Sequence, residues 1–169
     1  GNFDLSLSAA YTDSVLGPLI DVPNYKFPNG FGITPQCAPG VSPLPGNVNC
    51  SNYTPYLINV RGDEDPYAPK LTTSVTVDYN IHFGKQPLQP RLTYSHIDKQ
   101  YSSLFQSDDF SLMNARNLWN AYLDWSVGPW STELYTTNFT NQTYISGSNG
   151  ESVFYGPPRQ YGIQLRRSF

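Results

Sequence analysis

The sequence is poor in charged residues and has no long apolar run. Only 14% of its 169 residues are charged, and the formal net charge is -3. Because no broad basic surface is expected, nucleic acid is not predicted as a partner. No apolar run approaches the roughly 20 residues of a membrane-spanning helix, and no helix is predicted anywhere. The chain also opens without a leader peptide, which indicates a removed leader or an internal piece of something longer.

Residues that carry common chemistry are equally sparse. The two histidines, His82 and His96, fall on different predicted strands without Cys or carboxylate at ligand spacing, so neither a metal site nor a cofactor is predicted. No Ser/His/Asp order, glycine-rich phosphate loop or isolated carboxylate pair stands out, so the chain is predicted not to be an enzyme. The two cysteines, Cys37 and Cys50, share one Pro/Gly-rich segment. They either form a disulfide, which would imply an oxidising compartment, or remain two free thiols.

The sequence does contain long stretches that alternate between apolar and polar residues, most clearly at residues 71–83. Odd positions there are mostly apolar and end in Tyr79, Ile81 and Phe83, whereas even positions are polar and include Asp78. A period of two predicts a strand whose two faces meet different surroundings. An ordinary strand has about 5–6 residues, and this longer one fits the roughly 9–11 residues that cross a bilayer.

The same alternation predicts about six long strands, at residues 3–13, 71–83, 88–100, 112–127, from 130 onward and 159–169. Asn117 and Leu118 break the alternation of the fourth strand. Two short turns, at 84–87 and 128–129, are interleaved with long connections, chiefly 14–70 and the polar loop 138–158. Outer-membrane barrels have short turns on the periplasmic side and longer loops outside. A β-sandwich is not expected to have its short connections at one end of the strands and its long connections at the other.

The charged side chains also sort by face. Only Arg159 and Arg167 fall in the apolar frame, near the ends of the last strand, where a lipid-facing Arg costs about 0–1 kcal/mol rather than about 2–4 kcal/mol at mid-bilayer. The others lie in the polar frame, which would face the lumen of a barrel. Apart from Asp4, these predicted lumen-facing residues are Asp78, Arg91, Arg116, Asp124, Glu133 and Arg166.

Four short segments, in order, resemble TonB-dependent outer-membrane receptors. Residues 67–71 (YAPKL), leading into a strand that ends in Asp78 and Tyr79, are similar to the family's NAPKW…LDYRF segment. Residues 112–116 (LMNAR) resemble its LVNARLGL strand, and residues 130–144, with TNFTN at 137–141, resemble WELSLWGKNLTDKRY. Residues 155–163 (YGPPRQYGI), together with the final Phe169, resemble the closing GAPRTYGV…F. The resemblance covers about residues 67–169, and residues 1–13 fit the preceding strand.

The resemblance implies an all-β fold, an antiparallel meander of about six long transmembrane strands. These would form the C-terminal part of a large outer-membrane β-barrel of the 22-stranded type. Residues 1–169 would be that part, with 14–70 as a long extracellular loop and the plug domain absent. The remaining barrel strands and the plug would belong to another chain or a missing segment. Six strands are too few to enclose a lumen, and open sheet edges in lipid are costly.

The resemblance also implies a function. The family takes up scarce nutrients (iron chelates, corrinoids or oligosaccharides) across the outer membrane of Gram-negative bacteria when TonB acts on the plug. The polar-face charges would then dock the plug, and simple wetting of the barrel wall is the alternative. Loops on a rigid scaffold often carry binding, so aromatic residues of the long loop are predicted to contact the substrate: Tyr25, Phe27, Phe31, Tyr53 and Tyr56.

In this family, a terminal aromatic with apolar residues at alternate upstream positions is read by the barrel-assembly machinery. The resemblance assigns that role to Tyr161, Ile163, Leu165 and Phe169. Arg167 departs from the pattern, because an aromatic usually occupies its position.

Two other functions are compatible with the pattern of residues. A passive porin-like channel would share the barrel and the lipid bilayer but would lack the plug. A secreted, soluble β-sandwich that binds glycans or cells would pack the apolar faces of its strands against one another.

Overall fold

The computed structural model describes residues 2–18, 22–23, 37–38, 50, 52, 57–84, 86–104, 106, 111–149 and 152–169. Among these residues no helix is long and apolar enough to cross a membrane. The regular structure of the described residues is β-strand throughout. The strands are β1 (Phe3–Tyr11), β2 (Val22–Pro23), β3 (Leu57–Ile58), β4 (Leu71–Tyr79), β5 (Ile81–Phe83), β6 (Gln86–Ile97), β7 (Gln100–Tyr101), β8 (Leu112–Met113), β9 (Arg116–Val127), β10 (Trp130–Thr137), β11 (Ile145–Ser148), β12 (Val153–Tyr155) and β13 (Gln160–Arg167).

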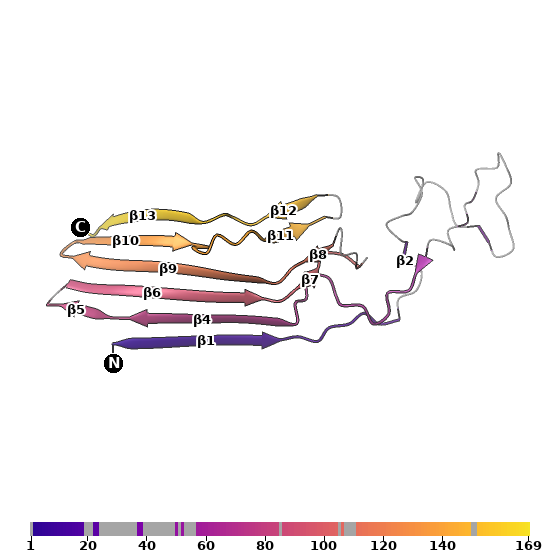
Figure 1. Ribbon diagram of the computed structural model, residues 1–169, viewed down its shortest axis with the longest axis horizontal. Helices are drawn as coiled ribbons and strands as arrows, with labels where there is room; N and C mark the ends of the chain where they lie inside the picture. The colour runs from indigo at the N-terminus through magenta and orange to yellow at the C-terminus, as the bar shows by residue number, and fades with distance from the viewer. Residues whose placement is uncertain are drawn as a thin grey trace.

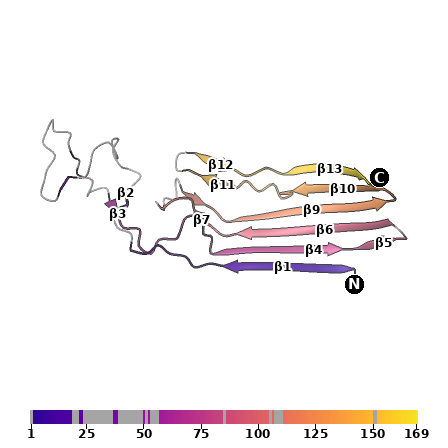
Figure 2. The same ribbon diagram turned by 180° about the vertical axis from the view of Figure 1, so that it is seen from behind.

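The long strands form one antiparallel sheet in the order β1-β4-β6-β9-β10-β13, and β5 extends it by pairing with β6. The sheet is a single layer in which neighbours in sequence are neighbours in space (Figure 1, and from behind in Figure 2). The chain ends N and C lie at the same end of the sheet as the short connections. The small strand pairs β2–β3, β7–β8 and β11–β12 lie at the other end. The predicted antiparallel meander of about six long strands is confirmed.

The register keeps the two faces of neighbouring strands in phase. One row of directly paired residues crosses four strands as Leu5, Val77, Leu92 and Ala121. The next row is polar throughout and consists of Ser6, Thr76, Thr93 and Asn120. A slip of one residue would move a whole strand's apolar set to the other face. Because no such slip occurs, the alternation seen in each strand becomes one apolar face and one polar face of the whole sheet.

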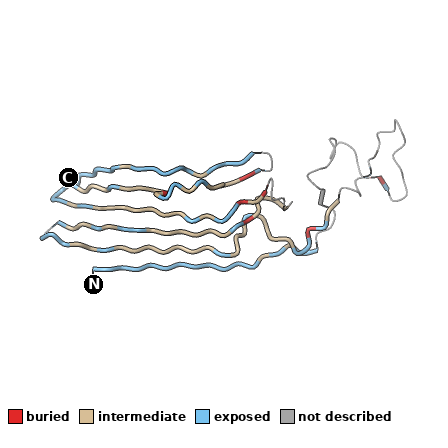
Figure 3. Tube along the Cα trace, in the orientation of Figure 1, coloured by how far each residue is buried: buried red, intermediate tan, exposed pale blue. Residues whose placement is uncertain are grey.

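The apolar face is not covered by a protein core. Leu7 is 72% exposed and Ile163 is 69% exposed, although both are large aliphatic side chains. Of the described residues, the buried hydrophobic ones are Cys37, Val60 and Met113, and none of them belongs to a long strand of the sheet. The edge strands β1 and β13 are exposed along nearly their whole length (Figure 3). A sandwich with a dry centre is therefore excluded for the described part of the chain.

Aromatic residues bracket the aliphatic part of the apolar face. On β1, Phe3 and Tyr11 lie at the two ends of the strand with leucines between them. On β9, Trp119 and Trp125 enclose Ala121 and Leu123. Transmembrane barrels carry an apolar band flanked by aromatic girdles at both interfaces. The apolar face has this arrangement on both strands.

The strand predicted at residues 71–83 is divided at Asn80 into β4 and β5. The register explains the break, because Asp78 pairs with Arg91 and Ile81 pairs with Leu88. Counting along the two strands places Pro90 opposite Tyr79, next to the interruption. Proline has no backbone N–H to donate to a neighbouring strand. The hydrogen-bond ladder with β6 is therefore interrupted between β4 and β5.

Other predicted boundaries also shift. The first strand ends at Tyr11 rather than at residue 13, and the predicted turn at 84–87 is shorter because β6 already begins at Gln86. Asn117 and Leu118, which break the alternation of the sequence, nevertheless lie inside β9 as part of the predicted strand. The interruption instead falls at residues 114–115, where β8 leaves the large sheet to pair with β7. The loop predicted at 138–158 contains the hairpin of β11 and β12.

Candidate functional site

The candidate site is the polar face of the large sheet, which carries all carboxylates of the long strands. Its seven charged side chains come from every long strand: Asp4, Asp78, Arg91, Arg116, Asp124, Glu133 and Arg166. All of them except Asp4 were among the residues predicted to line a lumen. Because side chains on one face alternate with those on the other, these residues share one side of the sheet without being adjacent in sequence. The structure divides them into three groups.

The first group pairs one cation with two carboxylates. The Nε atom of Arg91 donates a hydrogen bond to Oδ1 of Asp78 at 2.6 Å. On the other side, Asp78 directly faces Asp4 of β1. Like charges directly opposite each other destabilise a sheet, so Arg91 offsets the repulsion between the two aspartates. Both members of the ion pair remain partly exposed, at 42% for Arg91 and 25% for Asp78.

The second group holds two carboxylates that form no ion pair within 4 Å among the described residues. Asp124 and Glu133 face each other across β9 and β10, and Gln89 and Gln164 flank them in the same row. A concavity of about 90 Å³ is lined by both carboxylates, by Gln164 and by Arg166. Across the described ranges, no ion pair within 4 Å or side-chain hydrogen bond involves Asp124, Glu133 or Arg166. These three side chains are therefore available to an outside partner.

Arg116 forms the third group and is engaged by the loops. Its Nη1 atom donates to the backbone carbonyl of Ile145 at 3.1 Å, and its guanidinium carbon lies 5.2 Å from the ring centroid of Tyr144. A guanidinium within about 6 Å of an aromatic face is attracted by the ring. Arg116 therefore supports the base of the β11–β12 hairpin in the described structure.

Two tyrosines on the polar face were not among the predicted site residues. Tyr122 faces Arg91 on one side and Tyr135 on the other. Tyr135 in turn lies over Gly162, where an added Cβ would come within 2.2 Å of the Tyr135 Cζ atom. The even-odd parity of β9 would have placed Tyr122 on this face. The contact between Tyr135 and Gly162 depends on a register that no single strand reveals.

At the end of the sheet that carries the small strand pairs, side chains link the segments that connect the long strands. The hydroxyl of Tyr67 donates to the carbonyl of Ser148 at 2.9 Å. The Nζ atom of Lys70 lies 3.0 Å from Oε1 of Glu64. The hydrogen bond and the negative charge of Glu64 raise the pKa of Lys70, so Lys70 is protonated at neutral pH. These contacts hold residues 64–70 against the ends of the strands.

Asn138 is buried, at 4% exposure, and has a positive φ of 47°. Its Nδ2 atom donates to the carbonyls of Gln142 and Pro157, at 2.9 and 3.1 Å, and its Oδ1 accepts from the backbone N of Gln142 at 2.9 Å. Asparagine tolerates the left-handed region better than most residues. The side-chain amide of Asn138, in the TNFTN segment, therefore links residues 138–142 to residue 157 by hydrogen bonds.

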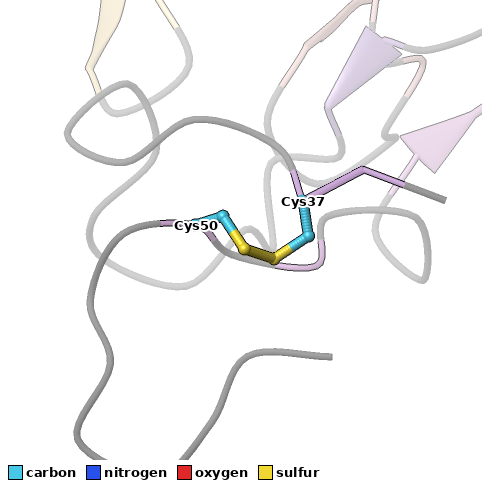
Figure 4. Close-up of a disulfide and its surroundings, with 2 residues drawn as sticks. All are labelled: Cys37 and Cys50. Carbon is cyan, nitrogen blue, oxygen red and sulfur yellow. A yellow bond between two sulfur atoms is a disulfide. The ribbon is translucent and has the colours of Figure 1, made fainter. Parts of the chain in front are cut away.

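The structure describes only some of the loop residues for which a role was predicted. Cys37 and Cys50 are joined by a disulfide, with 4.8 Å between their Cα atoms (Figure 4). The aromatic residues predicted to contact substrate lie outside the described residues; they are Tyr25, Phe27, Phe31, Tyr53 and Tyr56. Within the described ranges, no group of three or more metal-ligating side chains is close enough to hold a metal ion.

Three of the four predicted assembly residues lie along the apolar face of β13, and Phe169 follows the strand. Tyr161, Ile163 and Leu165 are 70%, 69% and 62% exposed, and Phe169 is fully exposed. The three strand residues pair across the sheet with Thr136, Leu134 and Thr132 of β10, respectively. The alternate residues of β13 therefore share one exposed face, and their role in assembly stays a prediction.

No protein-family model and no curated protein matches the chain. Matching solved structures include the ferric yersiniabactin uptake receptor FyuA from Yersinia pestis, with a TM-score of 0.58 and 20% identity over 65% of this chain. Another is BauA, the ferric preacinetobactin receptor from Acinetobacter baumannii, with a TM-score of 0.58 and 18% identity over 65% of this chain. The sheet has the fold of part of a β-barrel receptor. The chain spans only 18% of FyuA and 16% of BauA.

Proposed function

We propose that residues 1–169 form the C-terminal part of a TonB-dependent receptor barrel in the outer membrane of a Gram-negative bacterium. The observation that carries this proposal is the exposed apolar face of a single-layer sheet. Leu7 and Ile163 lie on it at 72% and 69% exposure. Burying apolar surface contributes about 25 cal/mol per Å², so a face of this kind in water would be strongly unfavourable. Lipid tails on that face remove the cost.

The two edges of the sheet support a barrel that further strands complete. The strand order runs from β1 to β13 without the two pairing to each other. Unpaired backbone groups in lipid cost several kcal/mol each, so both edges require partners. The remaining barrel strands, from another chain or from a further segment, would supply them. The short turns would then face the periplasm, and residues 14–70 would extend outside the cell.

The polar face would line the lumen and contact a plug. Arg91 and Asp78 satisfy each other, and Arg116 is held by the loops. Asp124, Glu133 and Arg166 lack such partners among the described residues and line one concavity. These three are the side chains best suited to form salt bridges with the plug. TonB would act on this face only through the plug.

The proposed substrate is a ferric chelate bound at the outer loops. FyuA and BauA are receptors for ferric compounds, and both match the sheet that would carry these loops. Aromatic residues of the 14–70 segment, including Tyr25 and Phe27, would contact the chelate. A corrinoid and an oligosaccharide are the other nutrients that such a receptor could bind. No catalytic role is proposed for the chain.

The test is uptake by the whole protein that contains this chain. It is expressed in a Gram-negative host lacking its own receptors, in TonB-positive and TonB-null versions, and presented with ferric chelates, cobalamin and labelled oligosaccharides. We expect accumulation of a ferric chelate only in the TonB-positive host. Equal uptake in both hosts would establish a passive channel, and recovery of the protein in the soluble secreted fraction would overturn the barrel itself.

A second experiment tests the plug contact. The double variant Glu133→Gln and Arg166→Gln should loosen the plug and raise the sensitivity of cells to a large antibiotic normally excluded by the outer membrane. Arg116→Gln is the matched control, because it removes a polar-face cation that the loops already hold. Identical sensitivity of the double variant and the wild type would contradict plug docking by these residues.

A further inference from the structure

Arg167 breaks the pattern of the apolar face. It lies in the apolar frame of β13, directly paired with Trp130 at the end of β10. Among the long strands, every carboxylate lies on the polar face, so none shares the face of Arg167. No ion pair or hydrogen bond of the described residues involves its guanidinium. On a surface that faces lipid, a cation with no such contact can bind an anion supplied by the membrane.

Two aromatic rings hold this guanidinium in place. Its central carbon lies 5.3 Å from the ring centroid of Trp130 and 4.9 Å from that of Phe169. The backbone beside it is fixed as well, because the N–H of Ser168 donates to the carbonyl of Pro129 at 2.8 Å. We call Arg167, Trp130 and Phe169 the Arg167 cluster. The two rings therefore favour this position of the guanidinium.

The cluster lies at one boundary of the apolar face. Trp130 pairs with Val127 across the short turn, so the three residues Val127, Trp130 and Arg167 form the last row of the sheet at this end. The next row contains Trp125 and Leu165, paired through Thr132. In a membrane, this boundary is the level of the lipid headgroups, where tryptophan is enriched.

The chemistry of an exposed guanidinium indicates the ligand. Arginine is planar and carries five N–H donors in a fixed fork around its rim, and no described residue accepts from those of Arg167. Those donors match the oxygens of a phosphate in a bidentate arrangement. We propose that the Arg167 cluster binds the phosphate of an anionic phospholipid in the leaflet at the short-turn end of the barrel. This inference rests on the proposed placement of the sheet in the outer membrane.

The other arginine in the apolar frame differs in a way that supports the assignment. Arg159 lies at the opposite end of β13, 5.6 Å from the ring centroid of Tyr161. Its Nη1 atom donates to the carbonyl of Phe139 at 3.4 Å. Arg159 therefore already has a protein acceptor and a single ring, whereas Arg167 has two rings and no acceptor among the described residues. The lipid site is assigned to Arg167 alone.

The experiment counts bound lipid on the whole barrel. The protein is purified in mild detergent after incorporation into bilayers of phosphatidylcholine that contain phosphatidylglycerol, and retained lipids are measured by native mass spectrometry. Arg167→Gln removes the proposed ligand. Arg159→Gln is the matched control, because it removes the same charge from the other arginine of the apolar frame, which already has a protein acceptor. Arg167→Lys keeps the charge without the planar fork, and inorganic phosphate is added as a competitor.

We expect Arg167→Gln to lower the retention of phosphatidylglycerol by about fivefold, the effect of one basic residue near an anionic surface. Retention by Arg167→Lys should be intermediate, and Arg159→Gln should match the wild type. Equal retention by Arg167→Gln and the wild type, or an equal loss in both glutamine variants, would overturn the lipid site. Displacement by millimolar phosphate would instead assign the site to free phosphate and would also overturn it.

Membrane insertion is measured separately in every variant, by fractionation of outer membranes and by the heat-dependent gel mobility of folded barrels. A wild-type protein absent from the outer membrane would overturn the proposed function and the lipid site together. Normal insertion without selective loss of lipid in Arg167→Gln would overturn the lipid site alone. If Arg167→Gln fails to fold, Arg167→Lys decides, because retention equal to the wild type would contradict a role for the planar fork.

Discussion

Replacing Gly162 by alanine would test how the last strand is held in the sheet. Gly162 lies opposite Tyr135, whose ring covers it on the polar face. An added Cβ would come within 2.2 Å of the Tyr135 Cζ atom and 2.3 Å of its hydroxyl oxygen. Real Cβ atoms essentially never approach other heavy atoms this closely, so the tyrosine ring must leave its position. The perturbation therefore separates the ring from the backbone that it covers.

Two opposing effects set the size of the change. Overpacking of a well-fitted contact typically costs about 1–3 kcal/mol, whereas replacing glycine by alanine within a strand gains about 0.5–1 kcal/mol. We expect Gly162→Ala to lower the free energy of unfolding by about 1 kcal/mol. In a Tyr135→Ala background only the gain remains, so the same substitution should raise the free energy of unfolding. The coupling between the two positions is then about 1–3 kcal/mol.

The assay is urea unfolding of the whole barrel in lipid vesicles, followed by tryptophan fluorescence, for the wild type, both single variants and the double variant. Gly147→Ala is a matched control, because a Cβ there meets only a Phe154 side-chain carbon at 4.0 Å. A change of the same sign and size for Gly162→Ala in both Tyr135 backgrounds would refute the contact between ring and glycine.

Three further perturbations test the faces of the sheet and the loop. Leu7→Arg places a charge at the middle of the apolar face of β1 and should lower the free energy of unfolding in vesicles by about 2–4 kcal/mol, whereas Ser6→Arg on the polar face should change it far less. Similar losses in both would contradict contact with lipid. Arg91→Gln leaves two aspartates facing each other and should lower the free energy of unfolding by about 1 kcal/mol in the same assay. Adding Asp4→Asn to this variant should restore part of the lost stability. If it restores none, the two aspartates do not repel each other. Cys37→Ser should expose one thiol to a maleimide label, whereas the wild type should react only after reduction, and labelling of the unreduced wild type would exclude the disulfide.

The number, order and facing of the long strands could be predicted because each depends on a repeat of two residues. Where a strand alternates strictly, as at residues 3–11, its exposed face follows directly from the sequence. The chain also connects successive long strands by hairpins, so order in sequence becomes order in space. Both are local signals, and neither needs knowledge of which residues pair.

Interruptions of the strands could not be predicted, because they depend on the register between neighbours. Asn80 divides a stretch whose own alternation continues undisturbed, and the cause is the missing N–H of Pro90 on the adjacent strand. The assignment of roles within the polar face was limited in the same way. Arg116 and Arg166 are equivalent in their sequence pattern, yet only the fold shows that Ile145 engages Arg116.

Burial changes sharply where the strands leave the apolar band, and this change locates the boundary between two kinds of surroundings. Met113 of β8 is 1% exposed and Val60 is fully buried, whereas aliphatic side chains on the apolar face of the inner strands remain well exposed, as Leu92 and Leu134 show at 38% and 47%. A sheet within lipid needs no protein core, because lipid tails cover its apolar face. Beyond the bilayer, water replaces those tails, and apolar groups must be covered by protein.

The small strands at the loop end supply that cover. β8 separates from β9 after Met113, pairs with β7, and lies against β11. Tyr67 and Arg116 cross-link the same region through the carbonyls of Ser148 and Ile145. The extra strands therefore begin at the level where lipid would cease to protect the sheet. In the proposed membrane placement, the outer headgroup level would lie near residues 114–115, and an environment-sensitive label should report hydrocarbon at position 121 and a protein interior at position 113.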